Sequence, residues 1–168
     1  KEGRADLVLL LGYEPHLNWP GYAGAVLRLA EEQDVRRIYT MGGYLADISH
    51  ESETPISGST NNGKLVSELE KAGIELTNYN GPTSVYSEIM WRAKEENLGV
   101  ISLWCAVPMY STGPYPKAAM RMLNKLEQLI GIELDLKDLE EKAETFQKQF
   151  ERESRGERQP RDMLEALR

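Results

Sequence analysis

The residues best suited to proton or metal chemistry are the two histidines, and each lies near carboxylates in the sequence. His16 follows Glu14, and such a pair could move a proton because histidine titrates near neutral pH. His50 lies near Asp47 and Glu51, a set that could hold a metal ion. Neither set has the fixed spacing of a catalytic or metal-binding motif. We therefore favour a surface position for His16 and a polar loop around His50, and we predict no metal and no cofactor.

Cys105 is the single thiol and the one candidate for a cysteine nucleophile. A catalytic thiol needs a neighbouring histidine or cation that stabilises the thiolate. Cys105 follows Trp104 in an apolar stretch without such a neighbour, which indicates a buried structural cysteine. With no recognisable catalytic set, we favour a non-enzymatic role. One cysteine cannot form an internal disulfide, which suits a reducing compartment, and we expect a cytoplasmic protein.

Two glycine-containing turns could bind a small anion. Gly42-Gly43 follows a predicted strand and could present backbone N–H groups to an anion, although a tight strand exit explains the same pair. The sequence GPTS at 81–84 begins a helix, whose free N–H groups and hydroxyls attract phosphate or carboxylate, although ordinary capping explains the same residues and is the favoured interpretation. The predicted ligand-binding residues are Gly42, Gly43, Gly81, Thr83 and Ser84.

Four aromatic residues fall in predicted loops: Trp19, Trp104, Tyr110 and Tyr115. Aromatic side chains in loops either anchor a protein interface or close the hydrophobic core. We interpret these four as interface residues.

The elements that position these residues alternate along the chain. Apolar runs predict strands at 7–11, 37–41, 75–79 and 99–103, and helical periodicity predicts helices at 21–33, 64–72, 117–130, after Ser84 and after Asp135. Residues 44–60 form a long polar loop, a kind that is usually functional or disordered. Strands that alternate with helices predict an α/β fold with a mainly parallel sheet and helices on both faces.

The chain has 168 residues, enough for one domain with a proper core. We expect an α/β core at 1–133, as the C-terminal part of a larger domain, and a helical C-terminal extension at 134–168. The net charge of −7 argues against a nucleic-acid or anionic-membrane partner. Arginines at 152–161 are interleaved with glutamates, which is typical of a solvated helix or tail. No apolar run approaches the about 20 residues that span a membrane.

Several ordered motifs resemble the proteasome assembly chaperone 2 family over residues 7–150. These motifs are LLGYEP at 10–15, Trp19, RIYTMGG at 37–43, YNGPTS at 79–84, VISLWCAVPMY at 100–110, PYPKAA at 114–119 and LDLKDLEEKAE at 134–144. Met109 stands where a histidine is common in the family, and Tyr115 stands where an asparagine is common. Both departures argue against proton chemistry in this loop.

The resemblance implies a phosphorylase/hydrolase-like α/β fold and an upstream strand-and-helix segment before Lys1. Eukaryotic members of the family help to assemble the proteasome α-ring as part of a heterodimer. Some archaeal members bind the proteasome through a tail with a penultimate tyrosine, a mode not expected here because the sequence ends in EALR. We favour a homo-oligomeric protein that binds proteasome subunits or another protein. The alternative is an enzyme or binding protein for phosphate, a nucleoside or a nucleotide.

Overall fold

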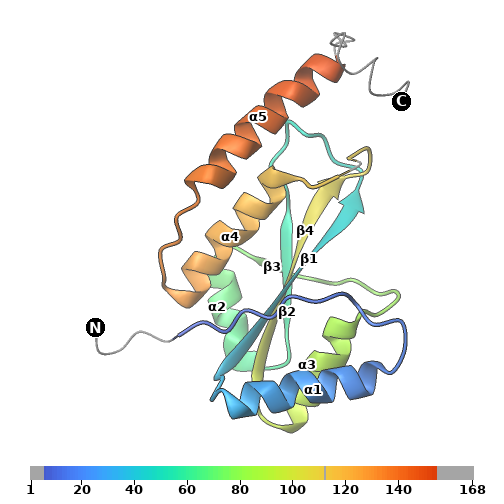
Figure 1. Ribbon diagram of the computed structural model, residues 1–168, viewed down its shortest axis with the longest axis vertical. Helices are drawn as coiled ribbons and strands as arrows, with labels where there is room; N and C mark the ends of the chain where they lie inside the picture. Colours follow the sequence, from blue (N-terminus) through green and yellow to red (C-terminus); the bar gives the residue numbers. More distant parts are fainter. Residues whose placement is uncertain (1–5, 112, 155–168) are drawn as a thin grey trace. The chain divides into compact units, whose positions relative to one another are not determined.

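Four strands form one sheet in the order β1-β4-β2-β3 in the computed structural model, which describes residues 6–111 and 113–154 (Figure 1). The strands are β1 (Arg37–Ala46), β2 (Ile56–Thr60), β3 (Glu75–Leu76) and β4 (Gly99–Pro108). The helices are α1 (Trp19–Glu32), α2 (Val66–Lys71), α3 (Val85–Glu95), α4 (Pro116–Ile130) and α5 (Lys137–Ser154). β2 and β3 are parallel, whereas Thr60 lies beside Val100 and Pro55 beside Ala106, so β2 is antiparallel to β4. The sheet is otherwise parallel, which confirms the predicted mainly parallel α/β fold.

The chain folds into two compact units, and β1 and β4 each run from one unit into the other. The first unit comprises the described residues of Lys1–Gly42 and Ile56–Trp104, and the second comprises those of Gly43–Pro55 and Cys105–Arg168. The division into residues 1–133 and 134–168 stays a prediction.

Helices cover both faces of the sheet in the first unit. On one face, α1 and α3 pack side by side and bury Leu27 and Ala93 against Val100 of β4. On the other face, α2 places Leu69 over Gly58 of β2, beside Leu103. Val100 and Leu103 are an odd number of residues apart, so their side chains point to opposite faces of the strand. The predicted two-sided helical cover is therefore confirmed.

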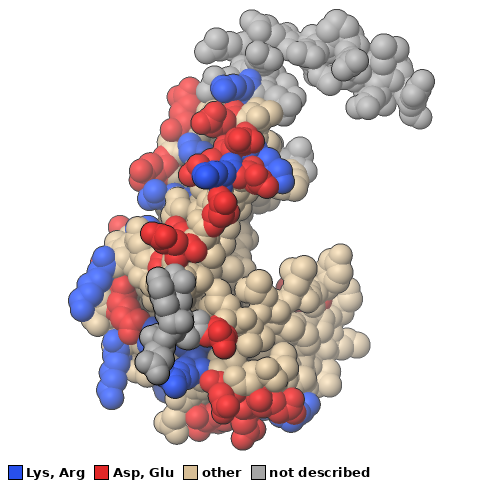
Figure 2. Space-filling model, turned by 60° about the vertical axis from the view of Figure 1, so that its left-hand side comes forward, with Lys and Arg blue, Asp and Glu red and all other residues tan. Residues whose placement is uncertain are grey.

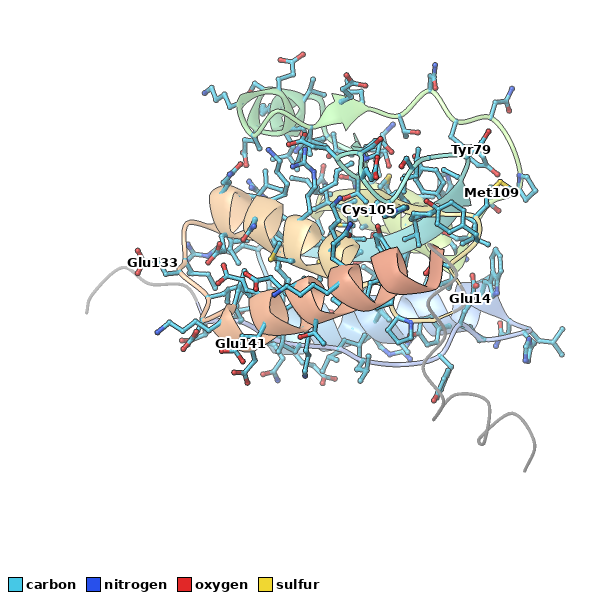
Figure 3. The ribbon with its side chains drawn as sticks, turned by 90° about the horizontal axis from the view of Figure 1, so that it is seen from above. Glu14, Tyr79, Cys105, Met109, Glu133 and Glu141 are labelled. Carbon is cyan, nitrogen blue, oxygen red and sulfur yellow. The ribbon has the colours of Figure 1, made fainter. Side chains whose placement is uncertain are left out.

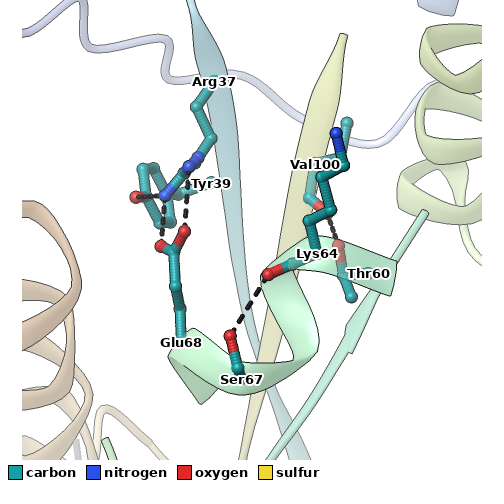
Figure 4. A network of polar contacts seen from close by, with 7 residues as sticks. All are labelled: Arg37, Tyr39, Thr60, Lys64, Ser67, Glu68 and Val100. Atoms are coloured by element: carbon teal, nitrogen blue, oxygen red, sulfur yellow. Dashed lines mark hydrogen bonds and ion pairs between the residues drawn. The ribbon is translucent and has the colours of Figure 1, made fainter. Parts of the chain in front are cut away.

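Polar contacts tie the start of α2 and the first strand together in the same unit. The Arg37 guanidinium donates to both carboxylate oxygens of Glu68, at 2.5 and 3.2 Å, and to the hydroxyl of Tyr39 (Figure 4). A two-pronged arginine–carboxylate pair fixes orientation as well as distance. Thr60 in turn donates to the Val100 carbonyl at 2.7 Å, which secures the end of β2 on β4.

In the second unit, α4 packs against α5. The ring of Tyr115 meets Phe146 edge-on, with centroids 5.4 Å apart. Gly131 ends α4 in the left-handed conformation with φ of 71°, the glycine cap that the sequence predicts. On the face shown in Figure 2, acidic and basic side chains lie interleaved over α5.

The predicted strand at 7–11 is wrong. Residues 7–11 form no strand, and the side chains of Leu7–Leu11 are 49–98% exposed. An apolar run forms a strand only where a neighbouring strand accepts its backbone hydrogen bonds, and none of the described strands pairs with this run.

The predicted loop at 44–60 is also partly wrong. β1 continues through Gly42-Gly43 to Ala46, and residues 56–60 form the unpredicted strand β2. The sequence of β2 is ISGST, in which Ile56 and Gly58 are buried while Ser57 and Ser59 are half-buried on the other face. Its small polar residues hid the alternation that identifies a strand. β4 also runs five residues further than predicted, to Pro108, and β3 is shorter, ending at Leu76.

Candidate functional site

The helix start at 81–84 is already occupied by a carboxylate of this chain. Ser84 is the residue before α3, and its side chain makes no capping hydrogen bond. Instead, the backbone N–H of Val85 donates to Oε1 of Glu14 at 2.9 Å. Glu14 therefore supplies the negative charge that the amino end of a helix attracts. Gly81 and Thr83 are exposed beside this contact, and anion binding there stays a prediction.

Gly42 accommodates an aromatic ring. The indole of Trp104 lies against it so closely that a Cβ atom on Gly42 would come within 2.6 Å of the ring. The Trp104 indole N–H donates to the Ser102 hydroxyl at 3.1 Å, and the ring packs on Tyr86 with centroids 5.9 Å apart. Gly43 faces Val107 at an ordinary 3.7 Å. Close packing thus explains Gly42 without an anion, and its predicted ligand role remains a prediction.

A pocket of about 270 Å³ lies between α3, β2 and β4 in the first unit. Its walls carry hydroxyls, an ammonium group and two indole rings, from Ser59, Ser84, Ser87, Lys94, Trp91 and Trp104. Ser102 also lines it, and its hydroxyl accepts hydrogen bonds from the Thr40 hydroxyl and from the Trp104 indole N–H. The sequence predicts Ser84 as a ligand-binding residue and Trp104 as an interface residue, and both line this pocket. The sequence analysis missed the others, although Ser84, Ser87, Trp91 and Lys94 recur at the three- and four-residue spacing of one helix face.

Neither histidine belongs to a recognisable reaction centre. His16 is exposed, beside the turn that leads to α1. The backbone N–H of His50 donates to the Tyr110 hydroxyl at 2.7 Å, and its ring Nδ1 lies 3.1 Å from the same oxygen. No group of three metal-binding side chains converges among the residues that the structure describes.

The loop between β1 and β2 is held by two cations from α4. Lys117 donates to the carbonyl oxygens of His50 and Ser52 at 2.7 and 2.8 Å. Arg121 donates to the Thr54 carbonyl at 2.9 Å. The loop therefore has a defined conformation in the second unit.

Cys105 is buried and only 2% exposed, as the sequence predicts (Figure 3). Burial raises the pKa of its thiol above the ordinary value, and only partial compensation comes from Thr54 and the positive charge of Arg121. The thiol is therefore mostly protonated near neutral pH, which disfavours a nucleophilic role.

The predicted interface aromatics have different environments. Trp19 is half-buried, and its indole donates to the Pro15 carbonyl at 2.7 Å. Trp104 is held in the first unit as described above. Tyr115 is buried against α5, whereas Tyr110 is 48% exposed. Of the four, Tyr110 is the residue most available to a partner.

Large apolar side chains are exposed where β1 and β4 end in the second unit. We name Tyr44, Leu45, Met109 and Tyr110 the strand-end surface; these residues are 43–63% exposed. The consecutive residues Tyr44 and Leu45 point to opposite faces of β1, so this surface wraps around the end of the sheet. The backbone N–H of Met109 donates to the Ala46 carbonyl at 3.0 Å, so the two strand ends adjoin.

No helix among the described residues is long and apolar enough to cross a membrane.

Comparison with known proteins gives a family and a set of similar folds. Residues 1–154 match the model of the PAC2 family. A crystal structure of a PAC2 family protein from Streptomyces avermitilis is 32% identical, with a TM-score of 0.78 over 84% of this chain and 59% of that chain. A proteasome-assembly chaperone homologue from Mycobacterium tuberculosis is 27% identical, with a TM-score of 0.72 over 82% of this chain and 57% of that chain.

A more distant structure shares the fold alone. It is the archaeal proteasome activator PbaB from Pyrococcus furiosus, 23% identical, with a TM-score of 0.65 over 79% of this chain and 57% of that chain. This chain thus spans less than two thirds of each of these solved relatives. Among curated proteins, none matches the chain.

Proposed function

This chain belongs to the PAC2 family, and we propose that it acts by binding other proteins and by associating with itself, in the cytoplasm. Its partner class is the subunits of a larger assembly, with proteasome subunits as the first candidates. A solved relative at 27% identity is a proteasome-assembly chaperone homologue, which supports this choice of partner.

The observation that carries the proposal is the strand-end surface. Tyrosine and methionine are typical of protein interfaces, because each offers a large apolar contact area. Burying an apolar surface that a single chain leaves in water stabilises a complex. Tyr44, Leu45, Met109 and Tyr110 lie in adjoining strand ends and are all at least 43% exposed.

Tyr110 is also preorganised for binding. Its hydroxyl accepts a hydrogen bond from the His50 backbone N–H, and Lys117 holds the His50 carbonyl from α4. An anchor side chain that is already held in place loses little conformational entropy when a partner covers it. The hydrogen bond from His50, whose loop is fixed by Lys117, therefore supports a role for Tyr110 as an interface residue.

The proposal is tested by light scattering during size-exclusion chromatography at micromolar concentrations. We expect the wild-type chain to have a mass above that of a single chain, and the double variant Met109→Ser with Tyr110→Ser to elute as a monomer. The matched control is Tyr79→Ser, which removes an equally large side chain that is 69% exposed in the first unit.

Two results would count against this function. If the wild-type chain stays monomeric over the whole concentration range, the proposed self-association is wrong. If the Tyr79→Ser variant dissociates as readily as the double variant, self-association does not depend on the strand-end surface.

A further inference from the structure

The pocket of the first unit has a chemistry that the proposed protein-binding role does not use. Three of its hydroxyls, on Ser59, Ser84 and Ser87, make no hydrogen bond to any residue that the structure describes. Each free hydroxyl can both donate and accept a hydrogen bond. Together they suit a ligand that carries hydroxyl groups of its own.

The indole walls add a fixed apolar surface to these hydroxyls. Trp104 is held by its hydrogen bond to Ser102, which is 3% exposed, and by the close approach of Gly42. Trp91 is 56% exposed, and the Arg92 guanidinium lies 5.8 Å from its ring centroid. A ring with an apolar face can pack on an indole while its polar edge binds the serines.

Lys94 gives the pocket its charge preference. In the described part of the chain, Lys94 is the one charged residue that lines the pocket. Its ammonium forms no ion pair with any described residue. At the opposite end of α3, the Glu14 carboxylate on Val85 repels a second anion. An anionic group of the ligand is therefore favoured at the Lys94 end, with its ring toward Ser84.

The dimensions of the pocket limit the ligand to a small molecule. Its volume of about 270 Å³ falls just below the usual range of about 300–1,000 Å³ for ligand pockets. Ser84 and Lys94 are ten residues apart, about 15 Å along the helix axis. The length of the lysine side chain reduces the distance that a ligand must bridge between the two groups. A dinucleotide is too large, whereas one ring with one phosphate fits.

From these walls, charge and size we infer that the pocket binds a sugar phosphate, either free or as the sugar-phosphate part of a mononucleotide. The phosphate lies at Lys94, the sugar hydroxyls bind Ser84, Ser87 and Ser59, and the ring packs on an indole.

The test follows the three tryptophan indole N–H signals by NMR in the ¹⁵N-labelled full chain. Ribose 5-phosphate, adenosine monophosphate, ribose and inorganic phosphate are titrated separately to millimolar concentration. We expect ribose 5-phosphate to shift the Trp91 and Trp104 signals and to leave Trp19, which lies outside the pocket, unchanged. Tighter binding of adenosine monophosphate identifies a mononucleotide as the source, and equal or weaker binding identifies a free sugar phosphate.

Two variants connect the signal to the proposed contacts. Lys94→Gln should weaken binding of ribose 5-phosphate about tenfold, because a charge-assisted contact is lost. Lys71→Gln, on α2 and away from the pocket, should not. The inference is overturned if no probe shifts Trp91 or Trp104, if inorganic phosphate binds as tightly as ribose 5-phosphate, or if Lys94→Gln leaves the affinity unchanged.

Discussion

Replacing Gly42 with alanine should destabilise the protein through the Trp104 indole. A Cβ atom at position 42 would lie 2.6, 2.8 and 3.0 Å from three atoms of that ring. Carbon atoms pack best at about 3.5–4.0 Å, so the ring must move by about 1 Å. The ring cannot swing away freely, because Ser102 holds its N–H at 3.1 Å and Tyr86 packs beside it.

The expected magnitude combines three effects. Overpacking of this kind costs about 1–3 kcal/mol. Weakening the Trp104–Ser102 hydrogen bond costs up to about 1 kcal/mol more. Alanine restricts the unfolded chain and returns about 0.4–1 kcal/mol. The midpoints of these ranges combine to a decrease in the free energy of unfolding of about 2 kcal/mol for Gly42→Ala.

Urea denaturation followed by far-ultraviolet circular dichroism measures this change from the transition midpoint. Gly43→Ala is the matched control, because the next residue of the same strand faces Val107 at an ordinary 3.7 Å. A double-mutant cycle with Trp104→Leu should show that the cost of Gly42→Ala falls once the ring is gone. Equal midpoints for the two alanine variants would refute the packing argument.

Three further substitutions test other contacts. Glu14→Ala should cost about 1 kcal/mol of unfolding free energy, measured by urea denaturation, because Val85 loses the carboxylate at the start of α3; unchanged stability would contradict that capping role. Arg121→Met should cost about 1–2 kcal/mol, since the Thr54 carbonyl loses its donor, and a smaller loss in Arg121→Lys would support the hydrogen bond as the cause. Burial raises the pKa of the Cys105 thiol above its ordinary value of 9.0, so the folded chain keeps a proton that the unfolded chain releases. This contribution to stability is full below pH 9.0 and is lost as the pH rises through the raised pKa; unfolding curves of Cys105→Ala across alkaline pH should lack that part of the decline.

The sequence patterns predicted those elements whose signals are local. The αL glycine at position 131 follows a strongly amphipathic run, and α4 ends there as expected. The first half of β4 is mostly apolar, with Val100, Ile101 and Leu103, and it lies in the interior of the sheet with helices on both faces. In both cases the residues that decide the structure are close together in the chain.

The missed elements depend on distant residues. Gly42-Gly43 resembles a strand exit, but β1 continues through it, and the absence of a Cβ atom at Gly42 leaves room for the Trp104 indole. β2 has few apolar residues, and its place beside β4 is secured by contacts such as that of Thr60 with Val100. Residues 7–11 show the opposite case, because their pattern is apolar but they pair with none of the strands in the described part of the chain. Strand pairing is a long-range property that local patterns do not encode.

The sequence analysis named only some residues of the candidate sites. Ser84 was named as a ligand-binding residue and Trp104 as an interface residue, and both line the pocket. Lys94 was not named from the sequence, because a lysine in the last turn of a helix is usually explained by its favourable interaction with the helix dipole. Tyr110 was predicted as an interface residue, and its contact with His50 links residues 60 positions apart.

Amide hydrogen exchange at low and high protein concentration tests the central claim, protein binding through the strand-end surface, most directly. We expect higher concentration to slow exchange at Tyr44–Ala46 and Met109–Ser111 and to leave α1 unchanged. Exchange that is independent of concentration at both strand ends, or slowed only in other segments, would contradict the proposed function.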